Sequence, residues 1–214
     1  MPKSDFSHVT TWVFDLDNTL YHPSMGLFAQ MNPKMSAYIM QVAGVNATKA
    51  DELRNRYWRE YGTTMAGLIE VHGMDPDAFL KDVHDINLSH LQIDPPLAKA
   101  IAALPGRKIV YTNGTAPYAR RVLAARGIDA VFDAVYGVEN AGYQPKPRAA
   151  AFEAIFAQAQ VDPTQSAMFE DEERNLAVPH DLGMRTVHVA DTAIPQPYIG
   201  HHTPDLTGFL SQLV

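Results

Sequence analysis

The sequence of 214 residues contains no cysteine, and this absence excludes disulfide bonds, thiolate catalysis and cysteine-based zinc sites. No apolar run reaches the roughly 18 residues that a membrane-spanning helix needs. The stretch "MPKSDFSHVTTW" also lacks the apolar centre of a signal peptide. We therefore expect a cytoplasmic protein that acts away from membranes.

Positive charge is also scarce. Lys and Arg number 17 against 24 Asp and Glu, and the net charge is −7. A nucleic-acid surface is normally basic, so we expect no nucleic-acid partner, although a local positive site could still hold one small phosphorylated molecule. Neither a P-loop nor a G-x-G-x-x-G motif occurs, so the sequence does not support Walker-type nucleotide hydrolysis or dinucleotide binding.

Short apolar, β-rich runs are present at residues 9–15, 108–113, 133–139, 166–171 and 185–190. Most of these runs are unbroken rather than alternating, which is typical of strands covered on both faces. Helical patterns separate the last four runs. Strands that alternate with helices predict an α/β fold, in which helices lie on both sides of a parallel sheet.

The segment between the first two runs differs from the rest of the chain. Residues 22–94 contain no convincing strand pattern, and Asp75-Pro76 marks a helix start inside them. The turn signal Asp94-Pro95-Pro96 marks the exit from this segment. We therefore predict a core domain of residues 1–21 and 95–214, interrupted by a helical cap domain of residues 22–94.

Polar residues occur where the predicted strands end. Because ligands bind beyond the carboxyl ends of the strands in open α/β sheets, we expect these residues to converge on one site. They are Asp15, Asp17, Thr112, Asn113, Gly114, Lys146, Glu170 and Asp171.

The acids of this set require a positive partner. An isolated ionised carboxylate is costly to bury, and Asp15, Asp171 and Glu170 would crowd negative charge together. A set of oxygen donors without cysteine suits Mg²⁺, which can also bind a phosphate oxygen. The sequence therefore predicts a site for Mg²⁺ and phosphate.

The two aspartates of "VFDLDNTLY" suit different steps of phosphoryl transfer. Asp15 needs no base to act as a nucleophile, and carboxylates do form aspartyl-phosphates. Asp17 would protonate the leaving oxygen and later take a proton from water, which requires a raised pKa. The groups that would stabilise the transferring charge are Thr112, the Asn113 and Gly114 amides, and Lys146.

The motifs "FDLDNTLY", "YTNGT", "KPRAAAF" and "FEDEERN" resemble, in order and position, those of the haloacid dehalogenase (HAD) superfamily. The segment after the first strand resembles the helical C1-type cap of that superfamily. The resemblance implies a Rossmann-like, three-layer α/β/α core and Mg²⁺ as cofactor. It also implies that Asp15 is the nucleophile and Asp17 the acid/base, whose backbone carbonyl contacts Mg²⁺. Thr112 and Lys146 would bind phosphate, and Asp171 would bind Mg²⁺.

The segments "MNPKMSAYI", "YGTTMAGLIEVHG" and "FLKDVHDI" resemble the pyrimidine 5′-nucleotidase branch of the superfamily. This implies hydrolysis of nucleoside monophosphates such as UMP or CMP. The branch usually has two adjacent aspartates where this chain has Glu170-Asp171, and a small residue in place of Glu172. The longer Glu170 side chain either reaches the metal through water or points elsewhere.

The same motifs are compatible with other functions. A phosphatase or phosphomutase for small sugar phosphates would use a similar core, and a non-catalytic phosphate-binding protein could keep the fold. A dehalogenase is disfavoured, because the acid Asp17 serves an alkoxide leaving group and a halide needs none. The sequence leaves the substrate and the oligomeric state undetermined.

Two sets of residues in the helical segment are expected to have structural roles only. We expect Arg54, Arg56 and Arg59 on a solvated helix face. Tyr57, Trp58 and Tyr61 fit the core of the segment better than a platform for stacking bases.

Overall fold

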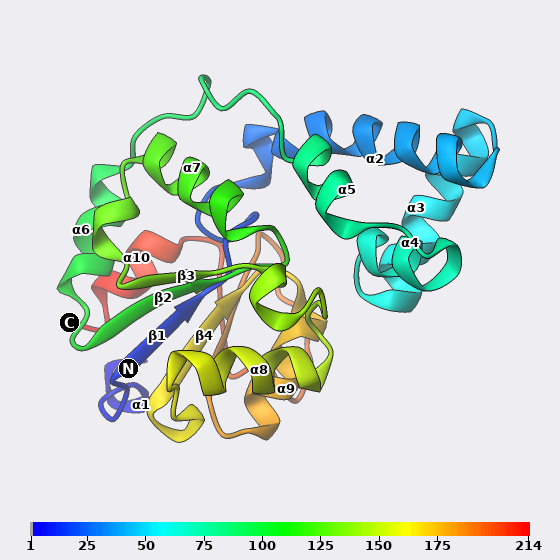
Figure 1. Cartoon of the computed structure of the whole chain (residues 1–214). Helices are drawn as coiled ribbons and strands as arrows, with labels where there is room; N and C mark the ends of the chain where they lie inside the picture. Colours follow the sequence, from blue (N-terminus) through cyan, green and yellow to red (C-terminus); the bar gives the residue numbers. More distant parts are fainter. Residues whose placement is uncertain (1) are drawn as a thin grey trace.

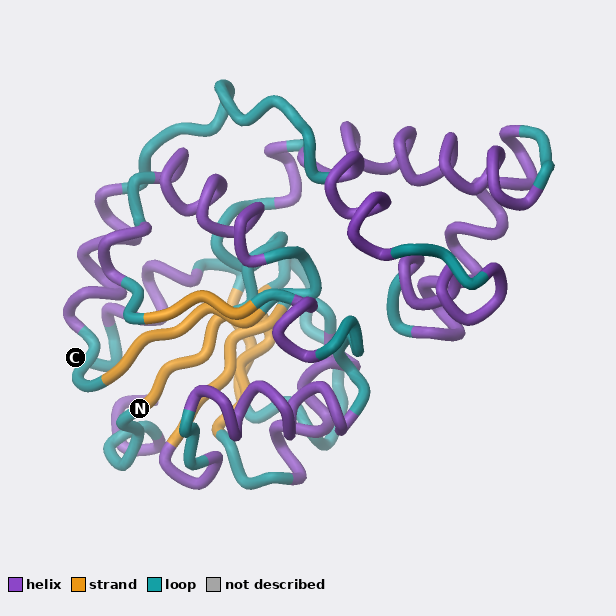
Figure 2. The backbone as a smooth tube through the Cα atoms, viewed as in Figure 1, coloured by secondary structure: helices purple, strands orange, loops and turns teal. Residues whose placement is uncertain are grey.

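The computed structural model describes residues 2–214, and at its centre lies a six-stranded sheet (Figures 1 and 2). The strand order is β3-β2-β1-β4-β5-β6, and every neighbouring pair is parallel. The strands are β1 (Thr11–Phe14), β2 (Arg107–Tyr111), β3 (Ala134–Tyr136), β4 (Ser166–Glu170), β5 (Arg185–Val189) and β6 (His201–Thr203). Because β1 to β5 coincide with the five predicted runs, the prediction of a parallel α/β sheet is confirmed.

Strand β6 is the one element of the sheet that the sequence did not predict. It is only three residues long, and it extends the sheet by pairing with β5 through His188 and His202. Two adjacent histidines in a segment rich in proline do not produce the apolar run that marks the other strands. Its position follows from pairing with a strand that is already in place rather than from a local signal.

Helices cover both faces of the sheet and give the expected three layers (Figure 1). The side chains of β1 show the division, because Trp12 and Phe14 pack into one apolar cluster with Val122, whereas Val13 packs into another with Phe152. The helices on the first face are α6 (Pro95–Ala103), α7 (Ala116–Arg126) and α10 (Leu206–Ser211); those on the second are α8 (Ala149–Ala159) and α9 (Ala177–Asp181). A short helix, α1 (Pro2–Asp5), precedes β1.

Four helices lie between β1 and α6: α2 (Leu27–Ala43), α3 (Ala47–Tyr61), α4 (Thr64–His72) and α5 (Pro76–Val83). Side-chain oxygens of Asn46, Thr63 and Asp75 accept backbone amide hydrogens at the starts of α3, α4 and α5. In Figures 1 and 2 the four helices form a group beside the carboxyl ends of the strands, which we call the helical lobe (residues 27–83). The assignment of residues 22–94 as a separate cap domain stays a prediction.

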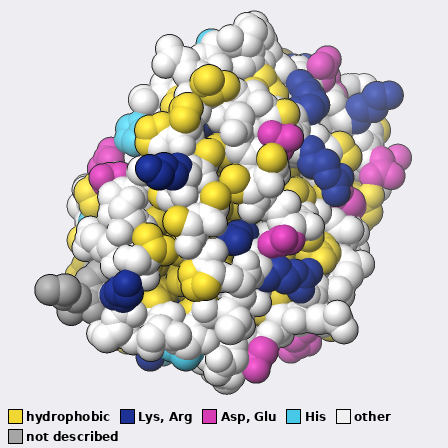
Figure 3. All heavy atoms as spheres, turned by 90° about the vertical axis from the view of Figure 1, so that its left-hand side faces the viewer, with side chains coloured by type: hydrophobic (Ala, Val, Ile, Leu, Met, Phe, Trp, Pro, Cys, Tyr) yellow, Lys and Arg dark blue, Asp and Glu magenta, His cyan; other side chains and the backbone are white. Residues whose placement is uncertain are grey.

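The surface carries charges of both signs, and the helices that the structure describes include no membrane span, as the composition predicts. On the face seen in Figure 3, Lys and Arg side chains are interspersed with Asp and Glu side chains and with apolar ones. Within residues 2–214, none of the helices combines the length and the apolar character needed to cross a membrane.

Candidate active site

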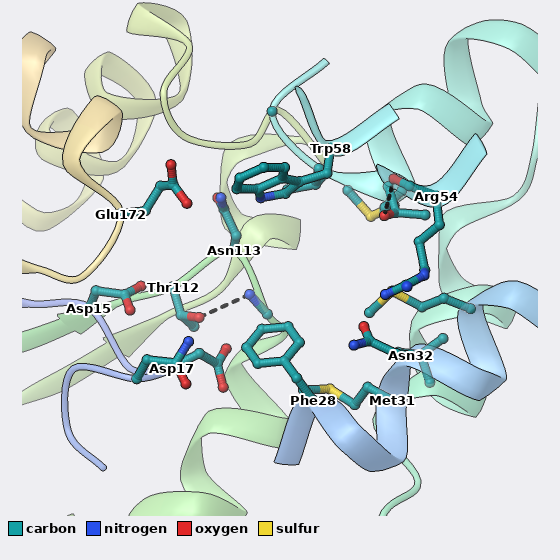
Figure 4. Close-up of a pocket in the computed structure, with 18 of the residues that line it drawn as sticks. Asp15, Asp17, Phe28, Met31, Asn32, Arg54, Trp58, Thr112, Asn113 and Glu172 are labelled. Carbon is teal, nitrogen blue, oxygen red and sulfur yellow. Dashed lines mark hydrogen bonds between the residues drawn. The ribbon is translucent and has the colours of Figure 1, made fainter. Parts of the chain in front are cut away.

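A cavity of about 440 Å³ lies between the carboxyl ends of the strands and the helical lobe (Figure 4). This volume lies within the range of about 300–1,000 Å³ that is usual for small-molecule sites. Of the eight predicted site residues, seven line the cavity: Asp15, Asp17, Thr112, Asn113, Gly114, Glu170 and Asp171. The eighth, Lys146, is buried and contacts two of the acids. The structure thus brings together residues that lie far apart in the chain.

Lys146 is the positive centre of the site. Its Nζ lies 2.6 Å from Oδ1 of Asp15 and 2.6 Å from Oε2 of Glu170, and it also donates to the carbonyl of Tyr111 at 3.1 Å. Burial alone would lower the pKa of Lys146, but the two carboxylates outweigh burial and raise the pKa above its usual value. The lysine is therefore charged, and the Glu170 side chain points toward it.

The Asn113 side chain positions the loop that carries Lys146. Its Oδ1 accepts the Lys146 backbone amide hydrogen at 2.8 Å, and its Nδ2 donates to the Lys146 carbonyl at 3.2 Å. These two hydrogen bonds tie the end of β2 to the loop before α8. The amide side chain of Asn113 thus acts on Lys146, in addition to any role of its backbone amide.

The carboxylates of Asp15, Glu170 and Asp171 form a cluster in which one oxygen from each lies within 4.8 Å of the others. Burial and the charge of Glu170 raise the pKa of Asp15 to about 8, and the same two causes raise the pKa of Asp171 well above its usual value. Asn18 Nδ2 holds Asp171 Oδ2 at 3.2 Å. Crowded acids with oxygen donors only are the environment that Mg²⁺ fits, because a divalent cation offsets their charge.

Two tyrosine hydroxyls hold the second aspartate. Oδ1 of Asp17 accepts a hydrogen bond from Tyr21 at 2.6 Å and another from Tyr118 at 2.8 Å. Burial raises the pKa of Asp17, and the two hydroxyls counter part of this effect because they stabilise the ionised form. The Asp17 carboxylate lies outside the three-acid cluster and lines the cavity.

The end of β2 forms another part of the wall. The side chain of Thr112 is fully buried, and its Oγ1 accepts the Gly114 amide hydrogen at 2.9 Å. A Cβ added to Gly114 would lie 2.9 Å from the Tyr118 ring, so a glycine is needed for this close approach. Thr115 caps α7 by accepting the Tyr118 amide hydrogen. The Gly114 amide is thus engaged by Thr112 in this structure.

The helical lobe contributes the opposite wall, and the sequence pattern did not predict this wall. Arg54 and Trp58 line the cavity, so the expectations of a solvated Arg54 and of a Trp58 in the core of the segment are both wrong. The Arg54 side chain is only 18 % exposed, and Tyr57, not Trp58, packs inward. Arg54 and Trp58 are four positions apart on one helix, which places them on one face. This spacing is the signal in the sequence from which the shared position of the two side chains could have been predicted.

Arg174 connects the core to the helical lobe. Its guanidinium donates to the backbone carbonyls of Trp58 at 3.1 Å and Gly62 at 3.2 Å, and it lies 4.4 Å from the centroid of the Trp58 ring. Its Nε is 3.1 Å from Oε1 of Glu172, and burial raises the pKa of that glutamate to about 7. These contacts join the end of α3 to the segment after β4.

Comparisons with known proteins agree with this architecture. A family model described as haloacid dehalogenase-like hydrolase matches residues 9–183. The chain is 26 % identical over 199 residues to phosphate metabolism protein 8 of Saccharomyces cerevisiae, and the match covers 83 % of the chain but only 61 % of that protein. The chain therefore spans less than two thirds of the length of this curated relative.

Solved structures share the fold at low sequence identity. A HAD phosphatase from Thermococcus onnurineus is 15 % identical with a TM-score of 0.65, and the match covers 96 % of this chain and 98 % of that one. The HAD hydrolase YfnB from Bacillus subtilis, solved bound to magnesium, is 15 % identical with a TM-score of 0.63 and the same two coverages. These likenesses show a common fold.

Proposed function

The chain belongs to the haloacid dehalogenase-like hydrolase family, and we propose that it is a cytoplasmic, Mg²⁺-dependent phosphatase that hydrolyses nucleoside monophosphates such as UMP or CMP. The observation that carries this proposal is the pair of aspartates in the cavity. Asp15 is ion-paired to Lys146, and Asp17 is held by two tyrosines. A phosphate ester needs an acid for its leaving alkoxide, whereas a halide does not.

The reaction proceeds in two steps, in which the phosphoryl group first passes to Asp15 and then to water. Burial and Glu170 raise the pKa of Asp15, whereas Lys146 lowers it, and a bound Mg²⁺ would favour the ionised carboxylate further. An ionised Asp15 oxygen attacks phosphorus, the bond to the ester oxygen breaks, and Asp17 gives its proton to the departing alkoxide. Asp17 then removes a proton from water, which attacks the aspartyl-phosphate and releases inorganic phosphate. The contact of 2.6 Å from Lys146 Nζ orients Asp15 and keeps one of its oxygens engaged. The product is the free nucleoside, and both aspartates return to their starting states.

The other predicted residues bind and position the phosphate group. Thr112, Asn113 and Gly114 line the cavity beside the nucleophile, where the Thr112 hydroxyl and the Asn113 backbone amide can donate to phosphate oxygens. The Gly114 amide would join them only by leaving its hydrogen bond to Thr112 Oγ1. Asp15, Asp171 and the Asp17 backbone carbonyl would hold Mg²⁺, with Glu170 acting through Lys146 or through water. The bound metal would neutralise the clustered acids and polarise the phosphate oxygens.

The comparisons support the phosphatase assignment and the metal. The yeast relative is named for phosphate metabolism, the Thermococcus onnurineus protein is called a HAD phosphatase, and YfnB was solved with magnesium and described as showing interdomain movement. The last description supports our proposal that residues 22–94 act as a cap over the core, residues 1–21 and 95–214. The nucleotide substrate rests on the resemblance of the cap motifs to pyrimidine 5′-nucleotidases.

A panel assay tests this function. Phosphate release from UMP, CMP, AMP, GMP and sugar phosphates is measured with Mg²⁺, and the Asp15→Asn variant is expected to lose turnover while keeping its circular dichroism spectrum. Asp181→Asn, at a carboxylate that is 81 % exposed, is the control and should retain turnover. A normal rate for Asp15→Asn would remove this residue from the nucleophile role.

The same panel separates the alternatives. Phosphate that passes to an added sugar-phosphate hydroxyl instead of to water would identify a phosphomutase. A folded, Mg²⁺-loaded protein that turns over none of the esters would instead be a non-catalytic phosphate-binding protein.

A further inference from the structure

The far wall of the cavity contains a cation without a hydrogen-bond acceptor. Arg54 lies on α3, and among residues 2–214 no atom accepts a hydrogen bond from its guanidinium; its Nε is buried without such a partner. We propose that Arg54 recognises the base of the substrate by donating hydrogen bonds to a carbonyl oxygen of a pyrimidine ring. This inference rests on the proposed function, because it places the phosphate of the same molecule at Asp15.

An acidic residue balances the charge of Arg54 from the side of Nε, and the two outer nitrogens of the guanidinium keep their hydrogens for other acceptors. The Asp51 carboxylate lies 3.6 Å from Nε, which is ion-pair distance but too long for a hydrogen bond. Asp51 is itself fixed by a 2.5 Å hydrogen bond from the Ser36 hydroxyl. An arginine has five N–H donors and no acceptor, so the outer nitrogens of an arginine oriented in this way are free to donate to a ligand that enters the cavity.

Arg54 is placed to meet the end of the substrate opposite the phosphate. In Figure 4, Arg54 extends into the cavity beside Asn32, on the side away from Asp15 and Asp17. A ligand whose phosphorus is at Asp15 must therefore extend across the cavity to reach the guanidinium. A nucleoside monophosphate has its base at that end, whereas a simple sugar phosphate has no group there.

The walls between these two ends suit a flat ring. Phe28 is 37 % exposed and Trp58 is 44 % exposed, and both of these large apolar side chains line the cavity. Exposed aromatic rings gain from contact with a flat ligand that covers them. Arg174 fixes Trp58 by contacting its ring and its carbonyl. Aromatic surfaces next to a donor-only cation and the Asn32 amide match a heterocyclic base with carbonyl oxygens.

Substrates with and without a base test the role of Arg54. Arg54→Gln removes the charge and the forked donors, and the control Arg56→Gln changes an arginine two positions away that is 46 % exposed and pairs with Glu60. For each protein, kcat and KM are measured with UMP and with ribose 5-phosphate. We expect Arg54→Gln to lower kcat/KM for UMP by about 10- to 100-fold, mainly through KM, since hydrogen bonds to a charged group are lost.

For ribose 5-phosphate, Arg54→Gln should stay within about twofold of the original protein, and Arg56→Gln should behave normally on both substrates. The proposal is overturned if Arg54→Gln leaves UMP unaffected, or if it lowers both substrates equally. Binding of UMP and of ribose 5-phosphate by calorimetry provides a second readout. If the protein hydrolyses neither ester, the proposed function fails, yet selective loss of UMP binding in Arg54→Gln would still support this contact.

Discussion

The Tyr118 hydroxyl donates a 2.8 Å hydrogen bond to Oδ1 of Asp17, although the two residues are 101 positions apart. The Tyr118 ring also stacks on His84 at the end of α5, with 4.3 Å between centroids and 8° between planes. The proposed acid/base is therefore tied through one tyrosine both to α7 and to the end of the helical lobe. We therefore predict that Tyr118 positions the proposed acid/base for proton transfer.

Replacing Tyr118 by phenylalanine tests this role. Tyr118→Phe keeps the ring that stacks on His84 but removes one of the two hydroxyls that hold Asp17. We expect kcat to fall about tenfold, because a hydrogen bond to a charged group is lost, while KM stays close to normal. Tyr38→Phe is the control, since the Tyr38 hydroxyl has no hydrogen bond within residues 2–214. An unchanged kcat for Tyr118→Phe would show that Tyr21 alone suffices.

His84 should make the stability of the fold depend on pH. Burial, with a smaller effect from Arg121, lowers the pKa of His84 from 6.5 to about 4. As the pH falls below 6.5, the unfolded chain binds a proton at His84 before the folded chain does. The contribution of His84 to the free energy of unfolding is therefore full above about pH 6.5, and it decreases as the pH falls to about 4. The loss from this one group is about 3 kcal/mol.

Urea unfolding at pH 7 and pH 4.5 measures this effect. His84→Phe keeps a ring against Tyr118 and removes the titrating group, so its stability should fall less between the two pH values than that of the original protein. His180→Phe, at a histidine whose side chain is 45 % exposed, should keep the original difference. Equal pH dependence in all three proteins would rule out His84 as the cause.

The fold was predictable because its signals are local. Val13 and its neighbours in β1 are buried on both faces, and this requirement leaves an unbroken apolar run in the sequence. The predicted convergence of Asp15, Thr112 and Glu170 follows from the same topology, because parallel strands end at one edge. Strand β6 had no such signal, since its residues depend on pairing with β5.

Other features of the site depend on contacts that a linear pattern does not contain. Helical spacing places Arg54 and Trp58 on one face of α3, but it does not say what that face meets. The hydroxyl of Tyr118 reaches Asp17 only because α7 packs beside the loop after β1. The Glu170 side chain, which the sequence left with two alternatives, points to Lys146. Tertiary packing decides each of these cases.

Mg²⁺ binding can be tested without measuring activity. The acids of the cluster repel one another, so bound Mg²⁺ should raise the melting temperature in proportion to RT ln(1 + [Mg²⁺]/Kd). Asp171→Asn should lose most of this increase, because it removes one of the three carboxylates. Glu173→Gln, at an acid outside the cluster in the same run, should retain it. If Mg²⁺ shifts both variants by the same amount, the cluster is not its binding site.

Arg174 should hold the helical lobe against the core, and the chain contains a built-in probe for this contact. It has two tryptophans: Trp12 is 1 % exposed, whereas Trp58 lines the cavity under the guanidinium of Arg174. Arg174→Ala removes the ring contact and the donors to the carbonyls of Trp58 and Gly62. We expect the α3 end to separate from the core and Trp58 to become more accessible to water.

Acrylamide quenching of tryptophan fluorescence measures that accessibility. Quenching should increase in Arg174→Ala, and the emission should shift to longer wavelength. In a Trp58→Phe background, Arg174→Ala should change neither signal. The remaining tryptophan, Trp12, lies in the core on β1, which pairs with β2 on one side and β4 on the other. An Arg174→Lys variant keeps the charge but lacks the forked donors that reach two carbonyls at once. Its quenching should therefore lie between that of the original protein and that of Arg174→Ala. If Arg174→Ala leaves quenching unchanged while Trp58 remains the accessible tryptophan, the lobe is held by other contacts.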